Sequence, residues 1–142
     1  MSRIINIESA GKERTYLTKA IVSALRELAL QKDLGEEVKD IVAFIIISLN
    51  TISKSIESSV AAWEKRDYWV KADRFRIEWA WAGKISAKMH EALISDDWED
   101  IVRMLAEIGK KLAKINVSEK NRIGTPWKGS WSELQKQEKM KY

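Results

Sequence analysis

The sequence contains few of the residues that most metalloproteins and thiol enzymes use. It has no cysteine, one histidine and one proline among its 142 residues. Without cysteine the chain cannot form a disulfide framework, a thiolate nucleophile or a cysteine-ligated metal site. The single histidine, His90, cannot supply a two- or three-histidine metal site within one chain. These absences exclude disulfide-stabilised, thiol-dependent and zinc-finger classes of protein.

Turn-forming residues and long apolar runs are also scarce. One proline and six glycines are too few turn-forming residues for the many turns of an all-β fold. The longest unbroken apolar run covers residues 41–47, far short of the roughly 20 residues needed to cross a bilayer. The first residues contain no apolar core of a signal peptide. We therefore expect a cytoplasmic protein without a membrane segment.

Four segments show the apolar periodicity of amphipathic helices. Apolar residues recur at alternating spacings of three and four, which predicts helices over residues 10–32 and 36–65, a third helix that ends near Ile94, and a fourth over residues 97–116. Ser9, Asp33 and Asp96 are the expected N-cap residues of the first, second and fourth helices.

The start of the third helix has no glycine or proline to mark it. A continuous helix over residues 36–94 would be about 88 Å long at 1.5 Å per residue, too long for a compact domain of this size. We therefore expect a tight turn within residues 65–71, with Asp67 or Asp73 as the N-cap. One long helix from which the other elements project is the alternative.

The last 25 residues have a different character. Residues 118–129 hold the only proline and two of the six glycines, which is typical of a loop. Ser130 and Glu133 have capping-box spacing, which predicts a short helix over residues 131–139. The expected fold is all-α: an antiparallel four-helix bundle over residues 1–117, with a tail over residues 118–142 that docks on the bundle or on a partner subunit.

Seven tryptophans point toward a protein interface. On a helix, Trp79 and Trp81 point about 200° apart, so both cannot face the same core. Because aromatic residues are enriched at interfaces, we predict a homodimer or a complex with another protein. The candidate interface residues are Ile77, Trp79, Trp81, Ile85, Trp127 and Trp131. Alternatively the tail covers the second face, with Trp127 and Trp131 as its anchors.

A second hypothesis is that the chain binds RNA or DNA. The formal net charge is +4, and basic residues alternate with Tyr68, Trp69 and Phe75, as single-stranded nucleic acid binding requires. The candidate contacts are Lys65, Arg66, Lys71, Arg74 and Arg76.

A third hypothesis is a magnesium-dependent carboxylate enzyme. Helical pyrophosphohydrolases hold Mg²⁺ with acid pairs spaced like those in two clusters of this chain, Glu36–Glu37–Asp40 and Asp96–Asp97–Glu99–Asp100. Both clusters lie in first helical turns, where acids simply complement the helix dipole. His90 lacks the Glu at position 87 of a di-iron motif, and we expect it to lie at the boundary of the core. The sequence singles out no catalytic, cofactor or metal residue, so we favour a non-enzymatic assembly protein.

Overall fold

The computed structural model describes residues 7–140, and within that range all regular structure is helical. Its helices are α1 (Ile7–Leu30), α2 (Glu36–Lys65), α3 (Trp69–Ile94), α4 (Trp98–Lys111) and α5 (Ser130–Met140). The prediction of an all-α bundle with a short C-terminal helix packed on it is confirmed. Residues 1–6 of the predicted bundle region 1–117, and residues 141–142 of the predicted tail 118–142, lie outside the described residues.

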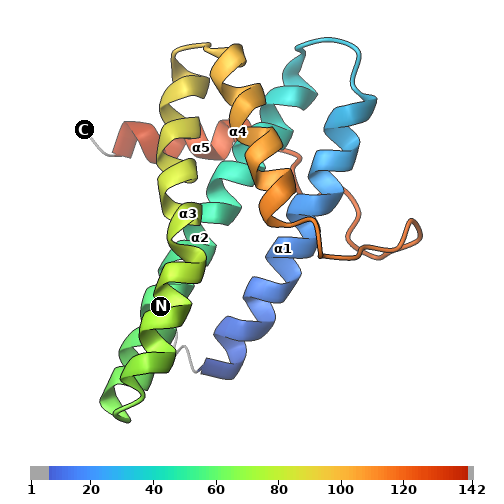
Figure 1. The fold of residues 1–142 in the computed structure, drawn as a ribbon. Coiled ribbons are helices and arrows are strands. Elements are labelled where there is room, and N and C mark those ends of the chain that lie inside the picture. Colours follow the sequence, from blue (N-terminus) through green and yellow to red (C-terminus); the bar gives the residue numbers. More distant parts are fainter. Residues whose placement is uncertain (1–6, 141–142) are drawn as a thin grey trace.

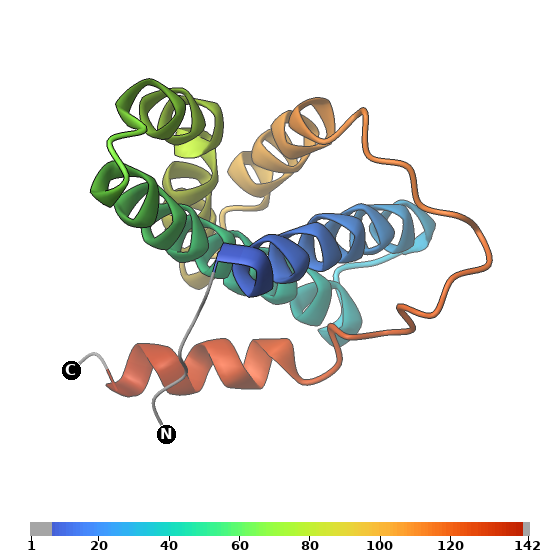
Figure 2. The same cartoon turned by 90° about the horizontal axis from the view of Figure 1, so that it is seen from below.

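The first four helices run alternately up and down (Figure 1). α2 packs against α1, α3 and α5, whereas α4 packs on α3 and touches α1. The hairpin formed by α2 and α3 extends beyond the end of α4 (Figure 1). α5 crosses the bundle on the side of α1 and α2 that faces away from α4 (Figure 2).

The central position of α2 follows from its composition. Every side chain from Ile41 to Ile46 is buried, which on a helix means burial in all directions. One 18-residue stretch of α2 reaches a mean hydropathy of 1.4, high enough by length and composition for a membrane span. Half of that stretch is buried inside the bundle, and its neighbours α1, α3 and α5 account for this burial.

Two turns of the same construction connect α2 to α3 and α3 to α4. Asp67 and Asp96 each adopt the left-handed conformation, with φ of 63° and 58°. The N–H of Tyr68 donates to the carbonyl of Trp63 at 3.0 Å, and that of Asp97 donates to the carbonyl of Ala92 at 2.8 Å. These i to i−5 bonds define a Schellman motif, in which glycine is the usual left-handed residue. Aspartate tolerates this conformation better than most residues do, so both helices end without a glycine.

The turn predicted near residues 65–71 is therefore present. The predicted N-caps of α3, Asp67 or Asp73, are wrong. Tyr68 occupies the N-cap of α3 and makes no side-chain capping bond. The N-cap of α4 is Asp97, whose side chain accepts from the N–H of Asp100 at 3.2 Å, one residue later than the expected Asp96. Asp96 is unavailable as a cap because it forms the left-handed end of α3.

The ends of α1 and the start of α2 also differ from expectation. α1 begins at Ile7, so Ser9 lies inside it. Gly35, not Asp33, is the N-cap of α2, without a side-chain bond. α4 ends at Lys111, five residues before the expected boundary, and turns toward the loop that leads to α5.

The tail packs on its own bundle through α2. The Trp127 ring, 3% exposed, meets Phe44 edge-on with ring centroids 6.4 Å apart. The backbone N–H of Trp131 donates to Asp40 Oδ1 at 2.9 Å, and Lys39 Nζ lies 5.8 Å from the centre of the Trp131 ring. Leu134 is buried as well. Trp127 and Trp131 thus serve as anchors within this chain.

The left-handed turn at Asp67 gives a test of the hairpin. The Asp67 side chain is exposed, so substitution mainly changes the backbone preference. Asp67→Val should lower the free energy of unfolding by about 1–2 kcal/mol, and Asp67→Gly should maintain or raise it. Urea denaturation followed by circular dichroism measures both values. Lys65→Val, an exposed change in the last turn of α2, is the control; an equal loss there would contradict this explanation.

Candidate functional site

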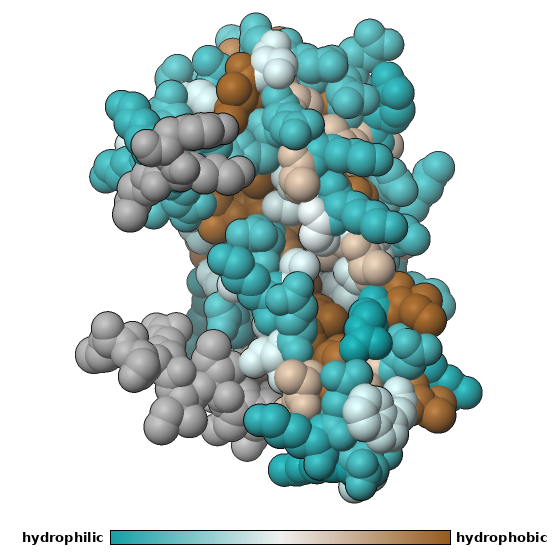
Figure 3. All heavy atoms as spheres, turned by 90° about the vertical axis from the view of Figure 1, so that its left-hand side faces the viewer, coloured by the Kyte–Doolittle hydropathy of each residue, from teal (hydrophilic) through white to brown (hydrophobic). Residues whose placement is uncertain are grey.

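The outer face of α3 exposes large apolar side chains. Val70 and Ile77 are 66% and 69% exposed and lie two turns apart on the side that faces away from α2. Trp81, one turn further along, is half-buried. In the space-filling view, apolar atoms interrupt the hydrophilic surface toward the end of the molecule formed by the α2–α3 hairpin (Figure 3). We call Val70, Ile77 and Trp81 the α3 ridge.

The two central tryptophans of α3 do not point apart as expected. Their rings stack, with centroids 5.8 Å apart and planes inclined by 24°. The 200° separation holds for the directions in which side chains leave the helix, but indole side chains are long enough to fold back along its surface. Both rings also pack on the edge of the core. Trp79 therefore supports the position of Trp81.

The candidate interface residues fall into three groups. Ile77 is exposed on the α3 ridge, whereas Trp79, Trp81 and Trp131 are half-buried. Ile85 is only 5% exposed, because α4 packs beside it, and Trp127 is only 3% exposed, because the tail docks on the bundle through it. Trp127 is thus buried against the rest of its own chain, and Ile85 is exposed only where it lines the space between α3 and α4.

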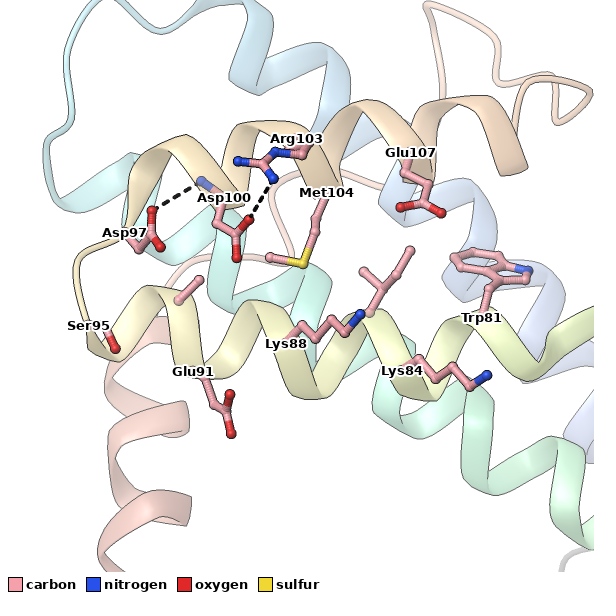
Figure 4. Close-up of a pocket in the computed structure, with 12 residues that line it drawn as sticks. Trp81, Lys84, Lys88, Glu91, Ser95, Asp97, Asp100, Arg103, Met104 and Glu107 are labelled. Carbon is pink, nitrogen blue, oxygen red and sulfur yellow. Dashed lines mark hydrogen bonds and ion pairs between the residues drawn. The ribbon is translucent and has the colours of Figure 1, made fainter.

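A groove of about 620 Å³ runs between α3 and α4, from Trp81 at one end to Ser95 and Asp97 at the other (Figure 4). Its buried lining is apolar: Ile85, Ala92 and Met104. Charged side chains surround this floor, with Lys84 and Lys88 on α3 and Arg103 on α4 (Figure 4). Arg103 is engaged with Asp100 at 3.6 Å. The groove therefore combines an apolar base with a rim of mixed charge.

The end of the α2–α3 hairpin exposes aromatic rings beside positive charges. Tyr68 and Trp69 are 53% and 58% exposed, and Lys65, Arg66 and Arg74 are exposed around them. These three cations make no ion pair within residues 7–140. The other two candidate nucleic-acid contacts are engaged: Lys71 Nζ lies 4.7 Å from the centre of the Trp63 ring, and Arg76 bonds Glu64 at 3.0 Å and Asp73 at 3.3 Å.

Phe75, the third aromatic residue of this segment, is part of the packing and not of the surface. It meets Trp63 edge-on, with ring centroids 4.9 Å apart. Arg14 of α1 places its guanidinium 4.8 Å from the Phe75 ring centre and donates to Ser55 Oγ at 3.1 Å. Burial lowers the pKa of Arg14, yet a guanidinium stays charged. These contacts join α1, α2 and α3.

His90 has a partner that no pattern in the sequence indicates. Its Nε2 lies 3.0 Å from Glu138 Oε2 of α5, 48 positions later in the chain. Both side chains line a cavity of about 280 Å³ together with Ser86, whose hydroxyl donates to the carbonyl of Ile46 at 2.9 Å. Because the Ser86 hydroxyl already bonds a backbone carbonyl, it is not a free nucleophile. Together, the contacts of Ser86 and His90 connect α3 to α2 and to α5.

One residue of each acidic cluster makes a structural contact. Asp40 receives the tail at Trp131, and Asp97 caps α4. Among the residues that the structure describes, no three His, Asp or Glu side chains gather closely enough to hold a metal ion.

Comparisons with known proteins give no match to a family model, to a curated protein or to a solved structure.

Trp127 provides a test of how firmly the tail is held. Trp127→Ala should lower the free energy of unfolding by about 3–5 kcal/mol, since it empties a buried aromatic site. Trypsin should then cleave the tail at Lys128 and Lys136 faster than in the unaltered protein. Trp69→Ala, which removes an exposed ring, should change stability by less than about 0.5 kcal/mol. Equal effects of the two changes would show that the tail is not held by Trp127.

Proposed function

We propose that this protein acts by assembling with a second copy of itself through the α3 ridge. The observation that carries the proposal is the exposure of Val70 and Ile77 on a helix face that no helix of the described chain covers. Apolar side chains in a row on one face are typical of an interaction site, whereas isolated ones are common on any surface. Trp81, held in place by Trp79, extends the row toward the groove.

The size of the α3 ridge sets the strength of the association. Burying each bulky apolar side chain contributes about 1.5–3 kcal/mol. In a two-fold interface the same three side chains are buried on each copy. The six side chains together contribute on the order of 10 kcal/mol to association. Ordering two molecules costs an estimated 4–15 kcal/mol. The expected assembly is a reversible dimer that depends on protein concentration in the micromolar range or above.

Ile77→Glu tests this proposal. A buried carboxylate without a partner opposes association, so the variant should be monomeric at concentrations where the unaltered protein is a dimer by light scattering and sedimentation. Because Ile77 is 69% exposed, the thermal stability of the variant protein at low concentration should equal that of the unaltered protein.

Val102→Glu is the matched control. Val102 is 62% exposed on α4 and lies away from the α3–α4 groove, so this variant should still dimerise. A monomeric unaltered protein at high micromolar concentration would refute the proposal, as would a dimer that Ile77→Glu leaves intact.

The exposed aromatic rings favour a second candidate function, binding of single-stranded nucleic acid at the end of the α2–α3 hairpin. Tyr68 and Trp69 offer stacking surfaces, and Lys65, Arg66 and Arg74 offer charges that no acid of the described residues neutralises through an ion pair. Stacking together with phosphate contacts is how non-specific single-strand binding is achieved. Asp67 and Asp73 in the same segment weaken the attraction for phosphate.

A salt titration tests this second function. With three phosphate contacts, the logarithm of the association constant for a labelled single-stranded oligonucleotide should fall with a slope of about −2 against the logarithm of salt concentration. Lys65→Glu/Arg66→Glu should abolish the anisotropy change at low salt. Lys110→Glu/Lys111→Glu, an equal change of charge on α4, should preserve it. Equal loss in both variants would indicate a general effect of net charge and no binding site at the hairpin.

A further inference from the structure

We infer that the two copies pair antiparallel, with Trp81 beside the two-fold axis, so that the α3 ridge of each copy lies in the α3–α4 groove of the other. This inference rests on the proposed self-association and specifies which surface of the second copy receives the ridge. It follows from the way α3 is divided along its length.

α3 consists of two halves with different surroundings. Trp81 lies at the middle of the helix, which extends from Trp69 to Ile94. The half before Trp81 extends beyond α4 and presents Val70 and Ile77. The half after Trp81 borders the groove as far as Ser95. Each half is about 18–20 Å long, so an antiparallel pair can place one kind of half against the other along the full helix.

Antiparallel pairing about Trp81 also matches apolar residues with apolar residues. A residue that lies a given number of positions before Trp81 then meets the one that lies equally far after it in the second copy. Ile77 lies opposite Ile85, and Val70 lies opposite Ala92. Ile85 and Ala92 form the apolar floor of the groove, so the exposed aliphatic side chains meet the part of the groove that is not charged.

The charges at the two ends of α3 favour the same arrangement. The turn before α3 carries the exposed cations Lys65 and Arg66, and the turn after it carries the exposed anions Asp96 and Asp97. Antiparallel pairing brings each basic turn near the acidic turn of the second copy, twice per dimer. Parallel pairing would bring like charges together, which opposes association. Asp67 offsets part of the positive charge, and Arg74 lies opposite Lys88, the one unfavourable match along the helix.

Single-cysteine variants test the arrangement directly, because the unaltered chain has no cysteine. Arg74→Cys and Lys88→Cys replace exposed residues, and a dimer of the two variants loses one of its two like-charged Arg74–Lys88 matches. In an antiparallel dimer these two thiols lie close together across the interface. Two thiols at position 74 are about 21 Å apart along the helix axis, as are two at position 88. A short bis-maleimide should therefore give covalent dimer in an equimolar mixture of the two variants, and none with either variant alone.

Arg26→Cys, exposed on α1, is the control and should give no covalent dimer with either variant. The dimer is measured in parallel by light scattering for every sample. Cross-linking of Arg74→Cys with itself would establish parallel pairing and overturn the inference. A non-covalent dimer whose mixture does not cross-link would also overturn it, while the proposed self-association would stand. A monomer in all samples would refute both.

Discussion

A helix that is apolar on every side must be covered on every side, and α2 imposes that requirement on the rest of the chain. Its residues from Ile41 to Ile46 are all buried, and the three helices α1, α3 and α5 together provide the cover. The tail is therefore part of the core and not an appendage. Without the tail, the side of α2 that carries Phe44 would lose Trp127 and Leu134 and would face water.

The covering of α2 determines which surface remains open. α1 and α5 pack mainly against α2, so α4 is the helix that covers the side of α3 facing away from α2. α4 has 14 residues and α3 has 26, so the cover is shorter than the helix beneath it. The exposed half of α3 results from this difference in length. The groove lies along the half of α3 that α4 covers, and Val70 and Ile77 of the α3 ridge lie along the half that α4 leaves open. The difference in length between α3 and α4 therefore produces both surfaces.

Periodicity was sufficient to predict the helices, because spacings of three and four depend on each segment alone. The turns were harder. Asp67 and Asp96 take the place that glycine usually has in a Schellman motif, and nothing in the sequence distinguishes such an aspartate from an N-cap. The contact of Asp40 with Trp131 and that of His90 with Glu138 connect residues far apart in the chain. Such pairs depend on how the helices dock, which a local pattern does not contain.

The tryptophans show why composition alone overstates the interface. Trp63 packs with Phe75 between α2 and α3, and the indole N–H of Trp98 donates to Asp96 at 2.6 Å across the α3–α4 turn. Trp127 and Trp131 fasten the tail. In a chain without disulfides, these large side chains join elements that would otherwise share little contact area. On the α3 ridge, the side chains left most exposed are aliphatic, Val70 and Ile77. Aliphatic side chains contribute less buried area than aromatic ones. An interface centred on them therefore favours a weak, reversible association whose extent depends on protein concentration.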